Sequence, residues 1–115
     1  MKLVIAIIKP DMLNQVREAL IKADITRITV SRCTGRGKGD KNGYLYRGKA
    51  VAPTLMPKVR IDIACNDEYV DTAVHTILKS AKHGKEGEIG DGKIFVVPLE
   101  KVYRIRTEEE GSEAI

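Results

Sequence analysis

The first third of the chain shows three successive patterns of hydrophobic and polar residues. Residues 3–8 are a near-continuous apolar run, which indicates a central strand, and Lys9-Pro10 closes it. From about Asp11 to Asp24 the apolar residues recur at steps of three and four, which predicts a helix with one apolar face: Leu13, Val16, Leu20 and Ala23. Residues 27–34 are rich in β-branched side chains and favour a second strand.

The remainder of the chain predicts a strand, a helix and another strand. In residues 58–65 every second residue is apolar, which is typical of a strand with one buried face. Asn66 or Asp67 is expected to cap a helix, whose apolar stripe is Val70, Ala73, Val74, Ile77, Leu78 and Ala81. A strand to about Leu99 follows a glycine-rich loop, then a short extended piece at residues 101–106 and an exposed acidic tail.

This order of elements, βαββαβ with an extra C-terminal extended segment (about 101–115), predicts an α+β fold of the ferredoxin-like type. The chain has 115 residues, which suits a single domain spanning 1–115. A core of that size is modest, and small domains often gain stability by forming oligomers. In this topology the connection after the second strand and the loop after the second helix leave the sheet at the same end.

The composition of the chain limits the classes of function that are expected. The net charge is +4 and aromatic residues are only 4%, which argues against stacking on single-stranded nucleic acid. Cys33 and Cys65 lie far apart and are expected to be reduced core thiols, with reactive thiols as the alternative. Neither a leader peptide nor a membrane span is predicted, so a cytoplasmic protein is expected.

A long polar segment at about 36–56 follows the second strand. Asn42-Gly43 is a type I′ turn signal, so that Tyr44-Leu45-Tyr46 could return as one arm of a small ribbon. A loop of this length in a small domain is usually functional, and Tyr46-Arg47 is a pair of the kind enriched at protein contacts. A partner-binding loop is favoured over an insertion without a role. Its cations, against Asp40, are Arg36, Lys38, Lys41, Arg47 and Lys49.

The second candidate site is the loop at about 82–93, which ends in Gly90-Asp91-Gly92-Lys93. Glycines let backbone N–H groups converge on an anion, and a lysine adds charge, so a phosphate ligand is predicted. The spacing also matches the start of a Walker A loop, but Ile94 stands where Ser or Thr would bind the metal, and a strand follows instead of a helix. The alternative is a plain turn before a strand.

The cations of these loops and of the C-terminal segment could bind one polyphosphate together. Arg104 and Arg106, two residues apart, would point the same way from an extended segment. Convergence is hard to arrange within one small subunit and easier between neighbours, so we expect a site at an oligomer interface. The five cations are Arg36, Lys38, Lys93, Arg104 and Arg106.

Strings along nearly the whole chain resemble the PII nitrogen-regulatory signal proteins. The two most specific are Tyr46-Arg47-Gly48 and Gly90-Asp91-Gly92-Lys93-Ile94-Phe95-Val96. The others are Ala6-Ile7-Ile8-Lys9-Pro10, Val16-Arg17-Glu18-Ala19-Leu20, Thr29-Val30, Leu55-Met56-Pro57-Lys58-Val59 and Arg104-Ile105-Arg106-Thr107.

The resemblance implies a homotrimer that binds ATP or ADP competitively in three clefts between subunits. The nucleoside end of the cleft would be lined by Ile7, Thr29, Asp62 (usually Glu) and Ala64, and the base and phosphates would be approached by Gly35, Arg36, Gly37 and Lys38. The phosphates would be cradled by Gly90, Asp91, Gly92 and Lys93. The neighbouring subunit would contribute Arg104 and Arg106. Residues 36–56 would be the T-loop, which docks on protein targets through Tyr44, Tyr46 and Arg47, the last entering the pore of ammonium channels. Other implied targets are enzymes and regulators of nitrogen assimilation, and the sequence does not name which applies.

Three departures from the family pattern are visible. Gly39 replaces the Gln that ligates the magnesium bridging ATP and 2-oxoglutarate, although Lys58, the implied partner of the 2-oxoglutarate carboxylate, is retained. We therefore expect a weak or absent 2-oxoglutarate response, unless Asp40 supplies the oxygen. Val51 replaces the tyrosine that is uridylylated in many members. About three extra residues precede Gly87, and a solvated turn is the simplest interpretation.

Two other functions stay open. A slow ATPase would need a metal ligand and a positioned water, and a turnover assay separates it from a sensor. A basic nucleic-acid module would shift nucleic acid in a gel at physiological salt. No catalytic or metal constellation is predicted, and His75 and His83 are both expected at the surface.

Overall fold

The computed structural model describes residues 1–37, 45–46, 49–50 and 55–115. Its main sheet has four antiparallel strands in the order β2-β5-β1-β6, with bounds β1 Lys2–Ile8, β2 Thr29–Gly35, β5 Met56–Cys65 and β6 Gly92–Pro98. The helices are α1 Leu13–Lys22 and α2 Asp67–Ser80, with short 3-10 helices at η1 Pro10–Met12 and η2 Gly111–Ala114. The expected α+β, ferredoxin-like order is confirmed.

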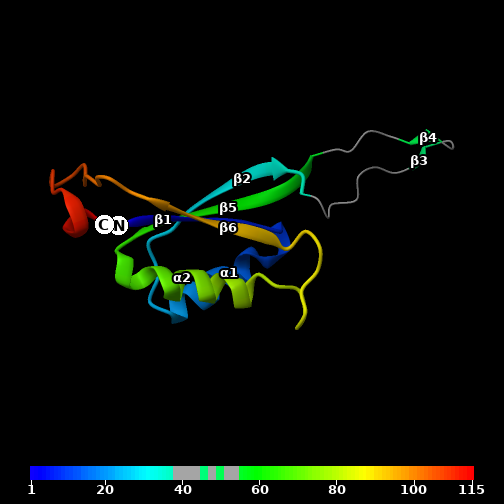
Figure 1. The fold of residues 1–115 in the computed structure, drawn as a ribbon, viewed down its shortest axis with the longest axis horizontal. Helices are drawn as coiled ribbons and strands as arrows, with labels where there is room; N and C mark the ends of the chain where they lie inside the picture. Colours follow the sequence, from blue (N-terminus) through cyan, green and yellow to red (C-terminus); the bar gives the residue numbers. More distant parts are fainter. Residues whose placement is uncertain (38–44, 47–48, 51–54) are drawn as a thin grey trace.

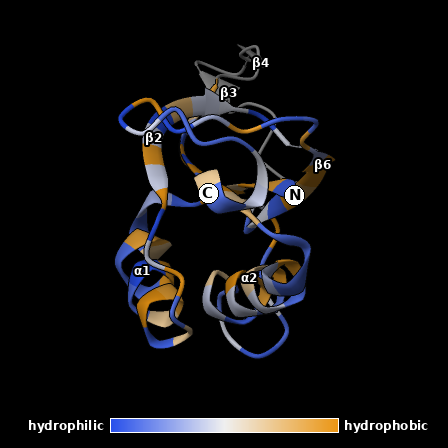
Figure 2. Cartoon of the chain, turned by 90° about the vertical axis from the view of Figure 1, so that its left-hand side faces the viewer, coloured by the Kyte–Doolittle hydropathy of each residue, from blue (hydrophilic) through white to orange (hydrophobic). Residues whose placement is uncertain are grey.

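Both α-helices cover the same face of the sheet, and the other face has no helix among the described residues (Figures 1 and 2). The alternation predicted for residues 58–65 produces this division. Val59, Ile61 and Ile63 are buried beneath the helices, whereas Arg60 and Asp62 lie on the open face. The core is completed by residues from β1 and the two helices: Val4, Ala6, Ile8, Val16, Leu20, Ala73 and Ile77.

Local contacts correct one detail of the expected elements and confirm part of another. Asn66 occupies the N-cap position of α2, but its side chain makes no cap hydrogen bond and instead donates to the Ser112 carbonyl at 3.2 Å. Leu45 and Tyr46 form one arm of a small ribbon as expected, since β3 Leu45–Tyr46 pairs with β4 Lys49–Ala50. The turn predicted at Asn42-Gly43 lies outside the described residues.

The C-terminal segment departs most from expectation. Residues 101–106 do not form a strand; only Tyr103 makes a β-bridge, to Glu110. The chain reverses between them, with the Arg104 N–H donating to the Glu109 carbonyl at 3.0 Å and Glu108 at φ 60°. In the acidic tail Glu108, Glu110 and Glu113 are exposed as expected, whereas Ala114 in η2 is buried.

Candidate functional site

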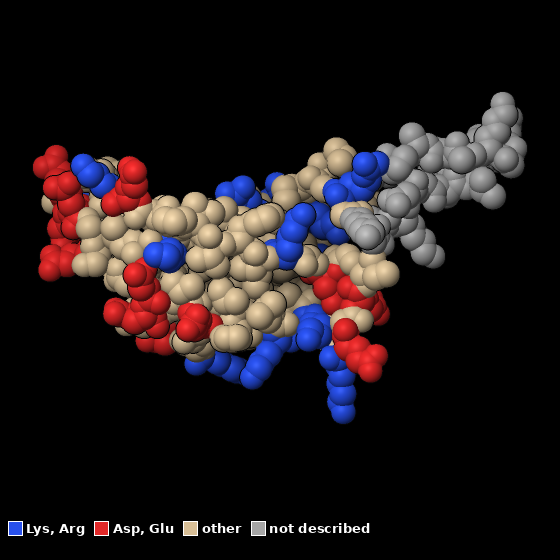
Figure 3. Space-filling view, in the orientation of Figure 1, with Lys and Arg blue, Asp and Glu red and all other residues tan. Residues whose placement is uncertain are grey.

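The end of the sheet where β2 stops and β6 begins brings the two predicted loops together. In the register Arg32 lies opposite Val59, Val59 opposite Ile8, and Ile8 opposite Gly92. The Lys58 ammonium lies 3.4 Å from the Gly90 carbonyl. Lysine and arginine side chains gather toward this end together with some carboxylates, and further carboxylates gather at the C-terminal end (Figure 3). The expectation that both connections leave from one end is confirmed.

The glycines of the loop are required by its backbone. Gly87, Gly90 and Gly92 have φ of 78°, 93° and 115°, values at which a side chain is strained. The Asp91 N–H closes the turn by donating to the Glu88 carbonyl at 3.2 Å. The predicted glycine-rich turn is therefore present, and whether it holds phosphate stays a prediction.

The Asp91 carboxylate organises this loop. It accepts hydrogen bonds from the Glu88 N–H at 2.8 Å, from the His83 N–H at 3.0 Å and from the His83 ring at 2.6 Å. Burial opposes ionisation of the carboxyl, but these bonds outweigh that effect and lower its pKa to about 2. The Asp91 carboxylate therefore fixes the shape of the loop by accepting hydrogen bonds from the backbone of Glu88 and His83.

We expect Asp91→Asn to lower the free energy of unfolding by roughly 2 kcal/mol at pH 7, because a pKa difference is a stability difference. The folded-state pKa is depressed from 3.8, so the stabilisation exists above that value and is lost as pH falls toward 2. Urea unfolding at pH 7 and pH 3 measures it. Asp71→Asn, on the exposed side of α2, is the control; equal midpoints for the two variants at pH 7 would contradict the prediction.

His83 lies in a loop as predicted, but it is half-buried rather than exposed at the surface, whereas His75 is exposed as expected. The His83 side chain is only 21% exposed, and its second ring nitrogen lies 3.2 Å from the Asp11 carboxylate. Within the described residues, donor atoms of His83, Glu88 and Asp91 lie within 4.8 Å of one another, a spacing that could hold a metal ion. The Lys9 ammonium lies 3.4 Å from Glu88 and 3.6 Å from Asp91, so a lysine already supplies the positive charge there.

The predicted nucleoside residues lie together on the open face. Thr29 pairs with Asp62, and Ile7 lies between Arg60 and Lys93 in the next row. Ala64 shares an open depression of about 360 Å³ with Thr29 and Asp62. Arg60 was not predicted; its guanidinium binds the Asp62 carboxylate at 2.9–3.1 Å, and these bonds raise the pKa of Arg60.

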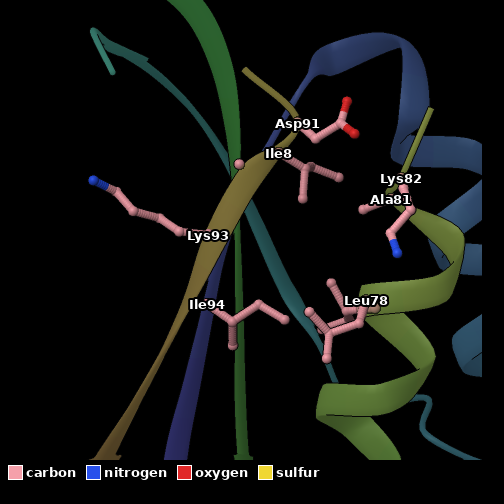
Figure 4. Close-up of a pocket in the computed structure, with 9 residues that line it drawn as sticks. Ile8, Leu78, Ala81, Lys82, Asp91, Lys93 and Ile94 are labelled. Atoms are coloured by element: carbon pink, nitrogen blue, oxygen red, sulfur yellow. The ribbon is translucent and has the colours of Figure 1, made fainter. Parts of the chain in front are cut away.

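Lys93 also belongs to the open face. Its ammonium lies 5.6 Å from the centre of the Phe95 ring. Figure 4 shows Lys93 on the opposite side of β6 from an apolar pocket of about 150 Å³, around which Ile8, Leu78 and Ala81 are placed. The loop is thus anchored on the core side while its lysine projects to the uncovered side.

The segment of residues 101–106, which carries Arg104 and Arg106, lies at the other end of the sheet from this loop (Figure 1). β6, with seven residues at about 3.3 Å each, separates the two regions. Arg104 is held by the Glu109 carboxylate at 2.9 Å and the Glu113 carbonyl at 3.0 Å, in a turn rather than an extended segment. The two arginines therefore do not point the same way from a strand, and they do not meet Lys93 within one chain.

The remaining predicted residues are only partly described. Gly35 ends β2 opposite Met56, and Arg36 is exposed beyond it. Tyr46 is described by its backbone in the ribbon. The predicted residues that lie outside the described residues are Lys38, Gly39, Asp40, Lys41, Tyr44, Arg47 and Val51.

Comparison with known proteins identifies relatives along the full chain. A family profile described as nitrogen regulatory protein P-II matches residues 1–109. The chain is 45% identical to nitrogen regulatory protein GlnK1 of Methanosarcina mazei over 100% of this chain and 97% of that protein. It is 48% identical to nitrogen regulatory protein P-II of Klebsiella oxytoca and to nitrogen regulatory protein P-II 1 of Escherichia coli K12, with 100% of both chains covered in each case. No helix among the described residues is long and apolar enough to cross a membrane.

Proposed function

This chain belongs to the nitrogen regulatory protein P-II family, and we propose that it is a homotrimeric sensor that binds ATP or ADP between subunits. Its role is regulatory signalling. Nucleotide occupancy would change the affinity of the T-loop, residues 36–56, for a protein of nitrogen metabolism such as an ammonium channel, an assimilation enzyme or a regulator. Such coupling requires that the two nucleotides bind the loop states with different affinities.

The observation that carries the proposal is the division of the basic residues between opposite ends of one chain. Lys58 and Lys93 lie beside the glycine loop, whereas Arg104 and Arg106 lie beyond the far end of β6. One protomer thus offers half of a polyphosphate site, and a neighbour packed against the sheet could supply the other half. Bidentate arginine contacts suit such a ligand.

The open face of the sheet supports the trimer. Three neighbouring pairs of β1 and β6 residues point to it, and they are largely apolar: Leu3 with Val97, Ile5 with Phe95, and Ile7 with Lys93. Phe95 is 45% exposed in the single chain. An exposed apolar sheet face of this kind is what a subunit interface covers. The proposed location is the cytoplasm, where a thiol such as Cys65 stays reduced.

Two measurements on the purified chain test the proposal. Light scattering should give three times the mass of one chain, and calorimetry should show ATP and ADP competing for one site per subunit. A monomer, or a trimer with no affinity for either nucleotide, would refute it. Continuous release of phosphate from Mg-ATP would favour the slow ATPase instead.

We further expect that 2-oxoglutarate binds weakly or not at all in the presence of Mg-ATP, because Gly39 has no side-chain oxygen for the metal. Gly39→Gln should then raise the affinity for 2-oxoglutarate roughly tenfold or more, since an oxygen ligand of the magnesium that bridges ATP and 2-oxoglutarate is regained. Calorimetry with saturating Mg-ATP measures both proteins. Micromolar binding by the unchanged chain would contradict the expectation, and its loss in Asp40→Asn would identify Asp40 as the metal ligand.

A further inference from the structure

The turn between α2 and the glycine loop is fastened to that loop by one residue. Residue His83 uses both its backbone N–H, at 3.0 Å, and its ring, at 2.6 Å, to bind the Asp91 carboxylate. The same carboxylate accepts the Glu88 N–H at 2.8 Å. The stretch before Gly87 is therefore more than a solvated turn, because it places a titratable ring against the carboxylate that shapes the loop.

The ring is also held from the opposite side. Asp11, in η1, lies 3.2 Å from its other nitrogen. Lys9 reaches the carboxylates of Glu88 and Asp91 at 3.4 and 3.6 Å. The charged groups around His83 are thus Asp11 and Lys9 from the segment after β1, and Glu88 and Asp91 from the loop, with neighbouring Lys82 packed under Gly87. His83 joins two segments 72 residues apart in the sequence.

We propose that His83 is a positioning residue for the phosphate loop, and that its protonated ring clamps Asp91 to Asp11 and so strengthens polyphosphate binding at Gly90–Lys93. The inference rests on the proposed nucleotide site. His83 itself does not contact the ligand. It acts by holding Asp91, whose carboxylate accepts the Glu88 N–H and so fixes the shape of the loop, and by offsetting negative charge beside an anion site.

The sign of the pH dependence follows from the two contacts. Only a protonated ring carries a hydrogen on both nitrogens, so only that form donates to both carboxylates. The hydrogen bonds with Asp11 and then Asp91 raise the pKa of His83 above 6.5. The clamp is therefore complete at low pH and is lost as the pH rises through this raised value. ATP affinity relative to a variant without the ring should fall over the same interval.

The test is calorimetric titration of the full-length protein with Mg-ATP at pH 6, 7 and 8.5. His83→Asn should bind about five- to tenfold more weakly than the unchanged chain at pH 6, the effect of one partly exposed charged hydrogen bond. The difference should vanish by pH 8.5. His83→Lys keeps the positive charge and should bind Mg-ATP like the unchanged chain at pH 6. At pH 8.5 it should still bind more tightly than His83→Asn, because lysine stays charged. His75→Asn, which alters the chain's other histidine, should match the unchanged chain throughout and cancels the titration of ATP itself.

A second readout separates the failure of this inference from the failure of the nucleotide site. Proton NMR of the His83 ring should give a pKa above 6.5, and Asp11→Asn should lower it. If the unchanged chain binds ATP but His83→Asn matches it at pH 6, the inference is overturned and the nucleotide site stands. If the unchanged chain binds no ATP while the His83 pKa is raised, the proposed function fails and the coupling to polyphosphate fails with it.

Discussion

Gly92→Ala is expected to lower the free energy of unfolding by roughly 3–5 kcal/mol, because overpacking and backbone strain add. An alanine Cβ at this position would lie 1.8 Å from the carbonyl oxygen of Ile7 and 2.9 Å from its carbon. Those atoms belong to β1, which is paired on both edges, by β5 and β6, and cannot withdraw. The backbone φ of 115° is strained for alanine in any case. The first residue of β6 therefore has to be glycine for the strand to pair.

Gly84→Ala is the matched control. Gly84 also has a positive φ, 69°, but nothing lies within 4 Å of the position its Cβ would take. Its substitution should cost only the conformational strain, about 1–2 kcal/mol. Urea unfolding of both variants at one fixed protein concentration compares them, since association shifts apparent stability. A Gly92→Ala midpoint equal to that of Gly84→Ala would show that β1 and β6 can separate to admit the methyl group.

The strands and helices could be predicted because their signal is local and periodic. The alternation in residues 58–65 and the stripe from Val70 to Ala81 record which face of each element meets the core. Their order then implied the fold and placed both loops at one end of the sheet. The identities of the nucleoside residues came from the resemblance instead, and the register is compatible with it because Thr29 lies opposite Asp62.

The features that could not be predicted depend on specific side-chain and backbone contacts, which leave no periodic hydrophobic pattern in the sequence. The C-terminal reversal occurs at Glu108, with φ 60° and no glycine to signal it, and is fastened by the pairing of Arg104 with Glu109. His83 looked like a surface residue because its partner Asp11 is 72 residues away. The bidentate pair of Arg60 and Asp62 had a sequence signal, since opposite charges two apart on a strand share a face.

The proposal of a site shared between subunits predicts a complementation that a site within one chain cannot show. Lys93→Ala and Arg106→Ala should each weaken ATP binding by about 10- to 100-fold, because each removes a charged contact to phosphate. Both side chains are exposed in the single chain, and no hydrogen bond holds either among the described residues, so both variants should fold. Thermal unfolding without nucleotide provides that control.

Mixing the two variants during refolding distinguishes the two arrangements. In a trimer whose clefts take Lys93 from one subunit and Arg106 from the next, random assembly from equal amounts leaves roughly a quarter of the clefts with both residues intact, since each choice has a probability of about one half. Calorimetry should then show that fraction of sites at the original affinity, although neither parent protein has any. If both residues served one site within a single chain, every site in the mixture would lack one of them and no high-affinity binding would return. Recovery of tight sites therefore requires Arg106 to reach a nucleotide held by another subunit's Lys93, which is the geometry that the separation along β6 demands.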